Sequence, residues 1–238
     1  MCHIRQSKAV PARVKRGGGF QKGRGDMKIV AATNNSKKLK EMERILKGLG
    51  FEVLSMGEAG VEVDPEENGE TFAANAAIKA AAVAERCGLA AVADDSGLCV
   101  DALGGAPGVH TARYCDRPGK KATDSQRMDH ILEELVCTPR ERRTARFVSA
   151  ICCVMPDGSR ITAEGVCEGW IGYQKLGDKG FGYDPIFMVG GQAGDLSSGR
   201  SFAQLTDEEK DAVSHRGKAL RAFAGEMESW IQRQGAAL

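Results

Sequence analysis

The chain has 238 residues, 42% of them hydrophobic, which is enough to bury one sizeable core within a single large domain. No apolar run approaches the roughly 20 residues of a membrane-spanning helix and no secretory signal is evident, so we expect a soluble, cytoplasmic protein with no membrane partner. The net charge of +1 combines a basic N-terminus with 26 basic and 31 acidic residues elsewhere, and this balance of −5 argues against general nucleic-acid binding.

Residues 1–26 form a basic, glycine-rich segment with seven basic side chains and one acidic side chain. They show no apolar periodicity, so we expect a disordered extension followed by one domain over residues 27–238. The composition also fits organelle import, although glycines weaken an amphipathic import helix, and it could contact nucleic acid. We favour a plain tail, or translation that starts at Met27, over import.

The eight cysteines include no CxxC pair and have no histidines at metal-ligand spacing, which argues against a zinc site. Cys152 and Cys153 are adjacent in an apolar, strand-like run, so a disulfide framework fits poorly. We expect reduced thiols.

Strands and helices alternate in the first part of the chain. Apolar runs predict the strands, and apolar residues at helical spacing or a run of alanines predict the helices. The predicted order is strand 29–32, helix 39–49, strand 51–54, acidic loop 62–70, helix 71–86 and strand 89–93. Such alternation favours an α/β architecture with functional groups gathered at strand ends.

The second part of the chain contains a helix, a hairpin and two further helices. We predict a helix over 124–136 and strands over 145–155 and 160–167, joined by a tight turn at 156–159. Thr206 and Glu209 form a capping box for a short helix, and a last amphipathic helix begins at His215.

The first candidate for function is the strand-to-helix turn at residues 33–38. It would present free backbone N–H groups, hydroxyls and amines at a helix N-terminus, which is how proteins hold phosphate. The residues are Thr33, Asn34, Asn35, Ser36, Lys37 and Lys38. The glycines of a P-loop are missing, and taken alone the turn is better explained as an ordinary capped helix with surface lysines.

The second candidate is the acidic pair Asp94 and Asp95, which end an apolar strand before Ser96 and Gly97. Neighbouring strand residues point to opposite faces, so we expect one of the two carboxylates to face a cleft. There it could bind magnesium and accept a proton from water. An Asx turn that ends the strand explains the pair equally well.

The third candidate is the glycine-rich loop with Phe181, Gly182, Tyr183 and Asp184. Its glycines allow close approach of a ligand, and its aromatic rings could stack on a nucleobase. Taken alone, aromatic residues that cover the core are the better explanation.

The fourth candidate is Ser214-His215-Arg216 at the start of the last helix, where several hydrogen-bond donors gather. The arginine suits either a base that carries carbonyl groups or a surface salt bridge. A lone histidine near a helix end is more often structural than catalytic.

Together and in this order, these four motifs and Leu103–Gly108 resemble the noncanonical purine nucleoside triphosphate pyrophosphatases, the inosine triphosphatase family. The resemblance extends from Met27 to about Gln232. It implies an elongated, two-lobed α/β fold with a central mixed sheet flanked by helices, a nucleotide cleft between the lobes, and a homodimer. It also implies Mg²⁺-dependent cleavage of ITP, dITP and XTP between the α and β phosphates, giving a monophosphate and pyrophosphate.

By position, the resemblance assigns Asp95 as proton acceptor and magnesium ligand. Glu67 is assigned as a second magnesium ligand, with the neighbouring Glu66 as an alternative. The residues that would bind substrate are Thr33, Asn34, Asn35, Ser36, Lys37, Lys38, Lys79, Ser96, Phe181, Gly182, Tyr183, Asp184, Lys210, His215 and Arg216. Asn34 stands where the family commonly has glycine, and because asparagine tolerates left-handed backbone we expect the turn to survive.

Inosine and xanthosine carry an acceptor O6 where adenosine carries an amino group, so donors from His215, Arg216 or the loop backbone would select the former. We accordingly expect Arg216→Ala to raise the KM for ITP more than it affects folding. The alternatives are a pyrophosphatase for modified pyrimidine or methylated nucleotides, and a nucleic-acid-binding protein that uses the basic tail.

Overall fold

The computed structural model describes residues 28–189 and 199–235, so the predicted disordered extension over 1–26 lies outside the described residues. One mixed sheet runs through the domain in the strand order β2-β1-β3-β4-β5-β6-β7. Strands β2, β1 and β3 are parallel, and the neighbours from β3 to β7 are antiparallel. The strands are β1 Lys28–Ala31, β2 Glu52–Ser55, β3 Ala90–Val100, β4 Thr144–Val154, β5 Arg160–Ile171, β6 Phe187–Val189 and β7 Arg200–Ser201.

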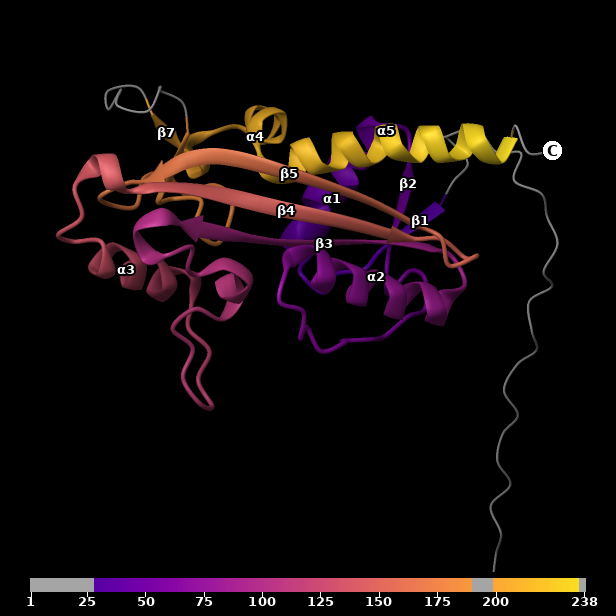
Figure 1. Ribbon diagram of the computed structural model, residues 1–238, viewed down its shortest axis with the longest axis horizontal. Coiled ribbons are helices and arrows are strands. Elements are labelled where there is room, and N and C mark those ends of the chain that lie inside the picture. Colours follow the sequence, from indigo (N-terminus) through magenta and orange to yellow (C-terminus); the bar gives the residue numbers. More distant parts are fainter. Residues whose placement is uncertain (1–27, 190–198, 236–238) are drawn as a thin grey trace, which may run out of the picture.

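Helices flank this sheet on both faces. The α-helices are α1 Ser36–Gly48, α2 Phe72–Cys87, α3 Asp124–Glu134, α4 Asp207–Val213 and α5 His215–Gly235. Short 3₁₀ turns lie at η2 Asp101–Leu103, η3 Gly108–Arg113, η4 Arg140–Arg142 and η5 Phe202–Gln204. Figure 1 shows α5 along one face of the long strands, with α2 and α3 on the other.

The core separates into three clusters of buried side chains. One joins α1 and α5 to the sheet, one joins α2 to the opposite face, and one lies between α3 and the far ends of β3, β4 and β5. Of the apolar positions expected to form the buried face of the last helix, Leu220, Phe223, Met227 and Trp230 are buried and Ile231 is partly buried. The prediction of an α/β fold with a mixed sheet flanked by helices is therefore confirmed.

Local capping explains where several elements begin and end. Helix α2 begins after Thr71, whose hydroxyl accepts from the N–H of Ala74, and ends at Gly88, whose φ of 67° is the left-handed conformation that glycine adopts without strain. The capping box of Thr206 and Glu209 begins α4, and the β4–β5 hairpin forms as predicted.

Strand β3 differs from the prediction, because it does not end at Ala93 but continues to Val100. Asp94 and Asp95 pair with Ile151 and Ala150 of β4, so the alternative of an Asx turn at the acidic pair is wrong. Gly97 permits the continuation, since a Cβ there would lie 2.5 Å from the carbonyl oxygen of Gly108 and 2.8 Å from the Phe72 ring. The long partner strand β4 overrides the turn propensity of the acids.

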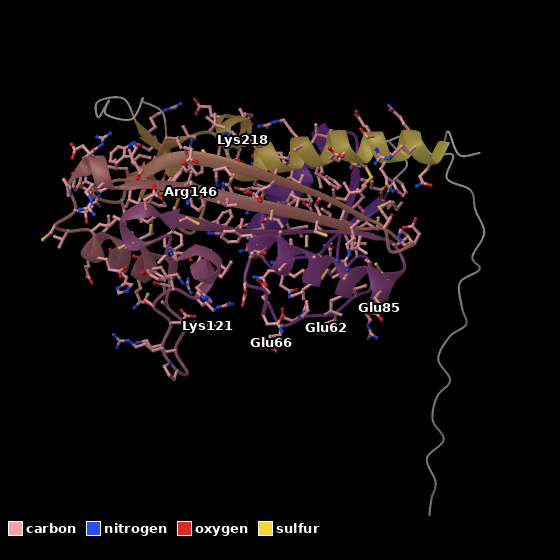
Figure 2. All side chains as sticks on the ribbon, viewed as in Figure 1. Glu62, Glu66, Glu85, Lys121, Arg146 and Lys218 are labelled. Carbon is pink, nitrogen blue, oxygen red and sulfur yellow. The ribbon has the colours of Figure 1, made fainter. Side chains whose placement is uncertain are left out.

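The outer surfaces carry charged side chains. Figure 2 shows Glu62, Glu66 and Glu85 on the outside of the α2 layer and Lys218 on the outside of the α5 layer. Among the described helices, none combines the length and the apolarity needed to cross a bilayer.

Candidate active site

A cavity of about 750 Å³ lies where the N-terminus of α1, the side of α2 and the loop before β6 meet. This volume is typical of sites for small molecules. Every residue that the sequence assigned to substrate or metal lines the cavity, although they come from seven separate stretches of chain. Glu67 is among the lining residues, whereas Glu66 is exposed and is not.

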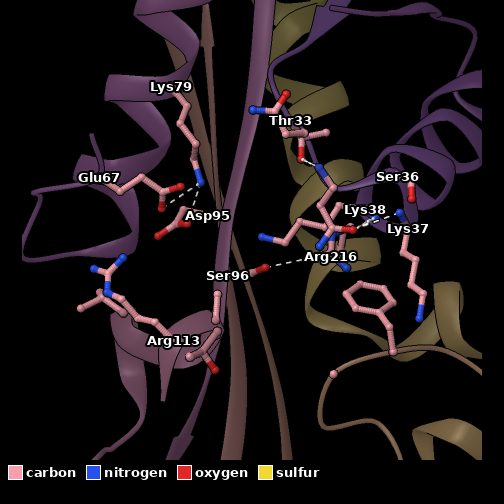
Figure 3. Close-up of a pocket in the computed structure, with 18 of the residues that line it drawn as sticks. Thr33, Ser36, Lys37, Lys38, Glu67, Lys79, Asp95, Ser96, Arg113 and Arg216 are labelled. Carbon is pink, nitrogen blue, oxygen red and sulfur yellow. Dashed lines mark hydrogen bonds and ion pairs between the residues drawn. The ribbon is translucent and has the colours of Figure 1, made fainter. Parts of the chain in front are cut away.

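The turn before α1 is held together by its own side chains. Asn35 is the N-cap, and its Oδ1 accepts from the N–H groups of Lys37 and Lys38 at 3.0 and 3.2 Å. These two N–H groups are therefore not free, which corrects the expectation of an open cradle of N–H donors. The turn is kept with Asn34 in it, as expected, and it needs no left-handed backbone there, because Cys115 is the only non-glycine with positive φ in the described residues. What the turn offers to an anion is mainly amines and hydroxyls (Figure 3).

Alternation along β3 separates the acidic pair. Ala90 and Val92 pack with α1 and α5, whereas Ala91 and Ala93 pack with α2. The same alternation places Asp94 on the α1 and α5 side and Asp95 on the α2 side. The two carboxylates therefore have different partners and different chemistry.

Asp94 is 1% exposed and fully paired. Its Oδ1 accepts from the Ser149 hydroxyl at 2.5 Å, and its Oδ2 accepts from Arg216 Nη2 at 2.8 Å and lies 3.2 Å from Lys38 Nζ. Although burial alone would raise it, the charges of Arg216 and Lys38 hold the pKa of Asp94 well below its usual range. Ser96, on the same face, donates to Asp94 and accepts from Arg216.

The buried charge network continues through Glu41, which the sequence analysis missed. Glu41 accepts from Arg216 Nη1 and from Lys210 Nζ, the latter at 2.7 Å, and Lys210 also donates to Asp184 at 2.7 Å. Burial opposes the charge of Glu41, but Arg216 and Lys210 together lower its pKa. The available signal was its position three residues after Lys38, on the same face of a helix that leads away from the turn.

Asp95 is 6% exposed and faces the other side of the cavity. Lys79 Nζ donates to Asp95 Oδ1 at 2.7 Å and lies 3.4 Å from Glu67 Oε2, as the dashed lines in Figure 3 mark. Burial raises the pKa of the Asp95 carboxyl, while Lys79 and Lys38 oppose the rise and Glu67 adds to it. A raised pKa makes this carboxylate a stronger proton acceptor than its neighbour Asp94.

Glu67 and Asp95 could hold a magnesium ion. Both carboxylates converge on one cationic centre, the Lys79 ammonium, which shows that a positive charge fits between them. Residues 28–189 and 199–235 contain no group of three or more His, Cys, Asp or Glu side chains arranged for a metal. Two carboxylates suffice for magnesium when phosphate oxygens and water complete its octahedron, so the residues fit this ion in the presence of a phosphorylated substrate.

The aromatic end of the cavity is built from the loop before β6 and the start of α5. The Phe181 ring lies 4.9 Å from Lys210 Nζ, 5.8 Å from Arg216 Cζ and 5.9 Å from Lys37 Nζ. The Tyr183 hydroxyl donates to the carbonyl oxygen of Thr111 at 2.8 Å, which ties this loop to η3. An aromatic face beside several cations suits a flat, electron-rich ligand group.

His215 is 4% exposed and stacks on Phe147, with ring centroids 4.6 Å apart and planes 12° apart. Its Nδ1 is buried, with no hydrogen-bond partner in the described part of the chain. Burial, assisted by the charge of Arg216, lowers the pKa of His215 well below 6.5, so the imidazole is neutral.

This neutral histidine predicts acid sensitivity. When the pH falls below about 6.5, the unfolded chain protonates His215 and the folded protein does not, so the free energy of unfolding must decrease. We expect a loss of about 1 kcal/mol from this residue between pH 7.5 and 5.5, absent from His215→Gln, in urea denaturation at both pH values. Equal pH dependence of the two proteins would contradict a neutral His215.

Some lining residues were not predicted. Arg113 of η3 and Lys121 before α3 both line the cavity, and Figure 3 shows Arg113 below Glu67 and Asp95. Asp124, at the start of α3, accepts from the N–H of Gly182 at 3.0 Å. These residues lie in a stretch that connects β3 to α3, and no spacing rule in the sequence links that stretch to the other motifs.

Comparisons with known proteins show which family and which solved structures this chain is similar to. Residues 29–226 match the Ham1 family. A dITP/XTP pyrophosphatase of Desulforamulus reducens is 46% identical over 195 residues, which is 82% of this chain and 92% of the relative. The solved structure of a HAM1 protein from Coxiella burnetii is similar with a TM-score of 0.72 and 40% identity, covering 85% of this chain and 99% of that one. A nucleoside-triphosphatase / dITP/XTP pyrophosphatase from Mycobacterium abscessus is similar with a TM-score of 0.63 and 44% identity, covering 82% and 98%.

Proposed function

This chain belongs to the Ham1 family, and from that membership and its cavity we infer that it is a nucleoside triphosphate pyrophosphatase for noncanonical purine nucleotides such as dITP and XTP. The reaction releases pyrophosphate and leaves the nucleoside monophosphate. The observation that carries this inference is the meeting of Asp95, Glu67, Lys79 and Lys38 in one cavity with an aromatic face at its other end.

We propose that Asp95 accepts the proton of the attacking water. Cleavage of a phosphate bond depends mainly on positioning and on neutralising the charge of the phosphate oxygens. Lys38 and Lys79 supply positive charge. The hydroxyls of Thr33 and Ser36 and the side-chain NH₂ of Asn35 orient the phosphates. Asp95 suits the base role because its raised pKa strengthens it and because it faces the cavity rather than the Asp94 network.

We propose that Glu67 and Asp95 hold magnesium together with the substrate phosphates. The ion, when bound, neutralises the triphosphate and makes its phosphorus more open to attack. Lys79 pairs with both carboxylates and so holds them close to each other.

The base is proposed to stack on Phe181 beside His215. The Nε, Nη1 and Nη2 atoms of Arg216 all donate to Glu41, Asp94 or Ser96. We therefore propose that Arg216 and Lys210 act mainly by supporting the aromatic end of the cavity through buried hydrogen bonds, rather than by binding the base. Of the predicted base-binding groups, His215 keeps an unpartnered ring nitrogen. A buried donor there would favour the O6 of inosine or xanthosine over the amino group of adenosine.

The two lobes with a nucleotide cleft between them, the homodimer and the cytoplasmic location stay predictions. The separation of the core into clusters around α1, α2 and α5 and around α3 supports two lobes.

A panel of triphosphates tests the substrate class. We expect kcat/KM for pyrophosphate release from ITP, dITP and XTP to exceed that for ATP by about 100-fold or more, because a site that donates to O6 leaves its donor unpaired with adenine. Modified pyrimidine and methylated nucleotides belong in the same panel. Highest efficiency on one of those, or release of phosphate instead of pyrophosphate, would contradict the inference.

A further inference from the structure

Glu67 lies in residues 61–69, a stretch with no helix or strand, so its position beside Lys79 requires attachments to the rest of the protein. One attachment comes from the first turns of α2, where Asn75 Oδ1 accepts from the N–H of Gly69 at 2.8 Å. Asn75 is 0% exposed. The bond therefore fixes the chain two residues after Glu67 from within the core.

The backbone at Gly69 lies directly against α2. A Cβ at this position would lie 2.6 Å from Asn75 Oδ1 and 2.8 Å from the Cβ of Ala74, distances that real side chains do not adopt. Glycine is thus required at 69 for the approach that the Asn75 bond uses. The hydrogen bond and the close packing are two separate observations of one contact.

Asn75 and Lys79 are one helical turn apart, so they share a face of α2. Lys79 meets the Glu67 carboxylate itself, at 3.4 Å, and meets Asp95 at 2.7 Å. The Nδ2 of Asn75 is buried with no hydrogen-bond partner in the described chain, whereas its Oδ1 accepts from the Gly69 N–H. Removing this buried acceptor would leave the Gly69 N–H without that bond and the acidic loop without this attachment to α2.

We propose that Asn75 is a positioning residue for Glu67, holding the acidic loop at the distance from Asp95 at which one divalent cation is bound by both carboxylates. The inference rests on the proposed role of Glu67 as a metal ligand. Asn75 acts only through the Gly69 N–H and contacts neither substrate nor metal. Partners of this indirect kind typically change metal affinity or activity by about 10- to 100-fold.

The test is Mn²⁺ binding to the full-length free enzyme, followed by electron paramagnetic resonance, with the Mg²⁺ concentration for half-maximal pyrophosphate release as a second measurement. Asn75→Ala should weaken Mn²⁺ binding about tenfold and raise the half-maximal Mg²⁺ concentration to match. Asn75→Asp, which keeps an acceptor for Gly69, should stay within about threefold of wild type. Substrate KM at saturating Mg²⁺ should change little in either variant.

Val154→Ala is the control for a purely structural effect, because Val154 is buried in the same cluster as α2 but lies at the far end of β4. It should lower the denaturation midpoint without changing Mn²⁺ binding. If Asn75→Ala binds Mn²⁺ as wild type does while Glu67→Gln binds it weakly, the positioning role is overturned and the metal role of Glu67 stands. If Glu67→Gln binds Mn²⁺ normally, the metal role fails and the inference fails with it.

Gly69→Ala gives an independent arm. Its methyl group must displace Asn75 Oδ1, so it should weaken Mn²⁺ binding by itself. Both substitutions break the same contact. The loss of Mn²⁺ affinity in the double variant Asn75→Ala/Gly69→Ala should therefore be much smaller than the product of the two single losses. Full additivity would show that Gly69 and Asn75 act separately and would overturn the proposal.

Discussion

Asp95→Asn is expected to lower kcat for ITP hydrolysis by about 10³-fold or more while the protein stays folded. The amide cannot accept the proton of the attacking water and is a poorer magnesium ligand, so both proposed roles of Asp95 are lost together. Asparagine has nearly the same shape as aspartate, and Lys79 retains Glu67 as an acidic partner. Turnover is measured by pyrophosphate release and folding by thermal unfolding.

The neighbouring residue provides a matched control. Asp94→Asn changes the same atoms one position earlier, but Asp94 is bound by Arg216, Lys38 and Ser149 rather than facing the metal site. We expect this variant to lose stability, because it leaves buried cations without their carboxylate. A near-wild-type rate for Asp95→Asn would remove Asp95 from the reaction, whereas equal loss of stability in both variants would show that the two faces of β3 do not differ.

The sequence predicted this contrast only in part. The rule that neighbouring strand residues face opposite sides was sufficient to separate Asp94 from Asp95. It did not reveal that the strand continues through both, because two acids before a glycine have the composition of a turn. The continuation depends on the ladder with β4, which pairs Asp94 with a residue 57 positions away in the chain.

The motifs were easier to find than the bonds between them. Each predicted motif is local, and the structure brings residues of the four candidate motifs to one cavity, whereas Leu103–Gly108 does not line it. By contrast, Arg216 meets Glu41 across 175 positions and Asp94 across 122. The local sequence around a helix residue such as Glu41 does not show that two distant cations will bind it. The side-chain types therefore predicted the chemistry of the site, but not which of its residues pair with each other.

The buried ion pairs of Arg216 change the effect expected from replacing it. From the sequence we expected Arg216→Ala to raise the KM for ITP more than it affects folding. The structure leads to the opposite expectation, because Arg216 is 2% exposed and its removal leaves Glu41 and Asp94 buried with less compensating charge. Breaking a buried ion pair from one side typically costs about 3–5 kcal/mol, and we expect a loss of this size in urea denaturation at pH 7.

The pH dependence of this loss identifies its cause. In the wild type, Arg216 lowers the pKa of both Glu41 and Asp94, so the stabilisation is present above their unfolded values and is lost as the pH falls through the folded ones. In Arg216→Ala the same carboxylates lack that charge, their pKa values rise, and protonation relieves the penalty at a higher pH. The difference in free energy of unfolding between the two proteins should therefore narrow between pH 7 and pH 4.5. An unchanged free energy of unfolding in Arg216→Ala, together with a raised KM for ITP, would instead support direct contact between Arg216 and the base.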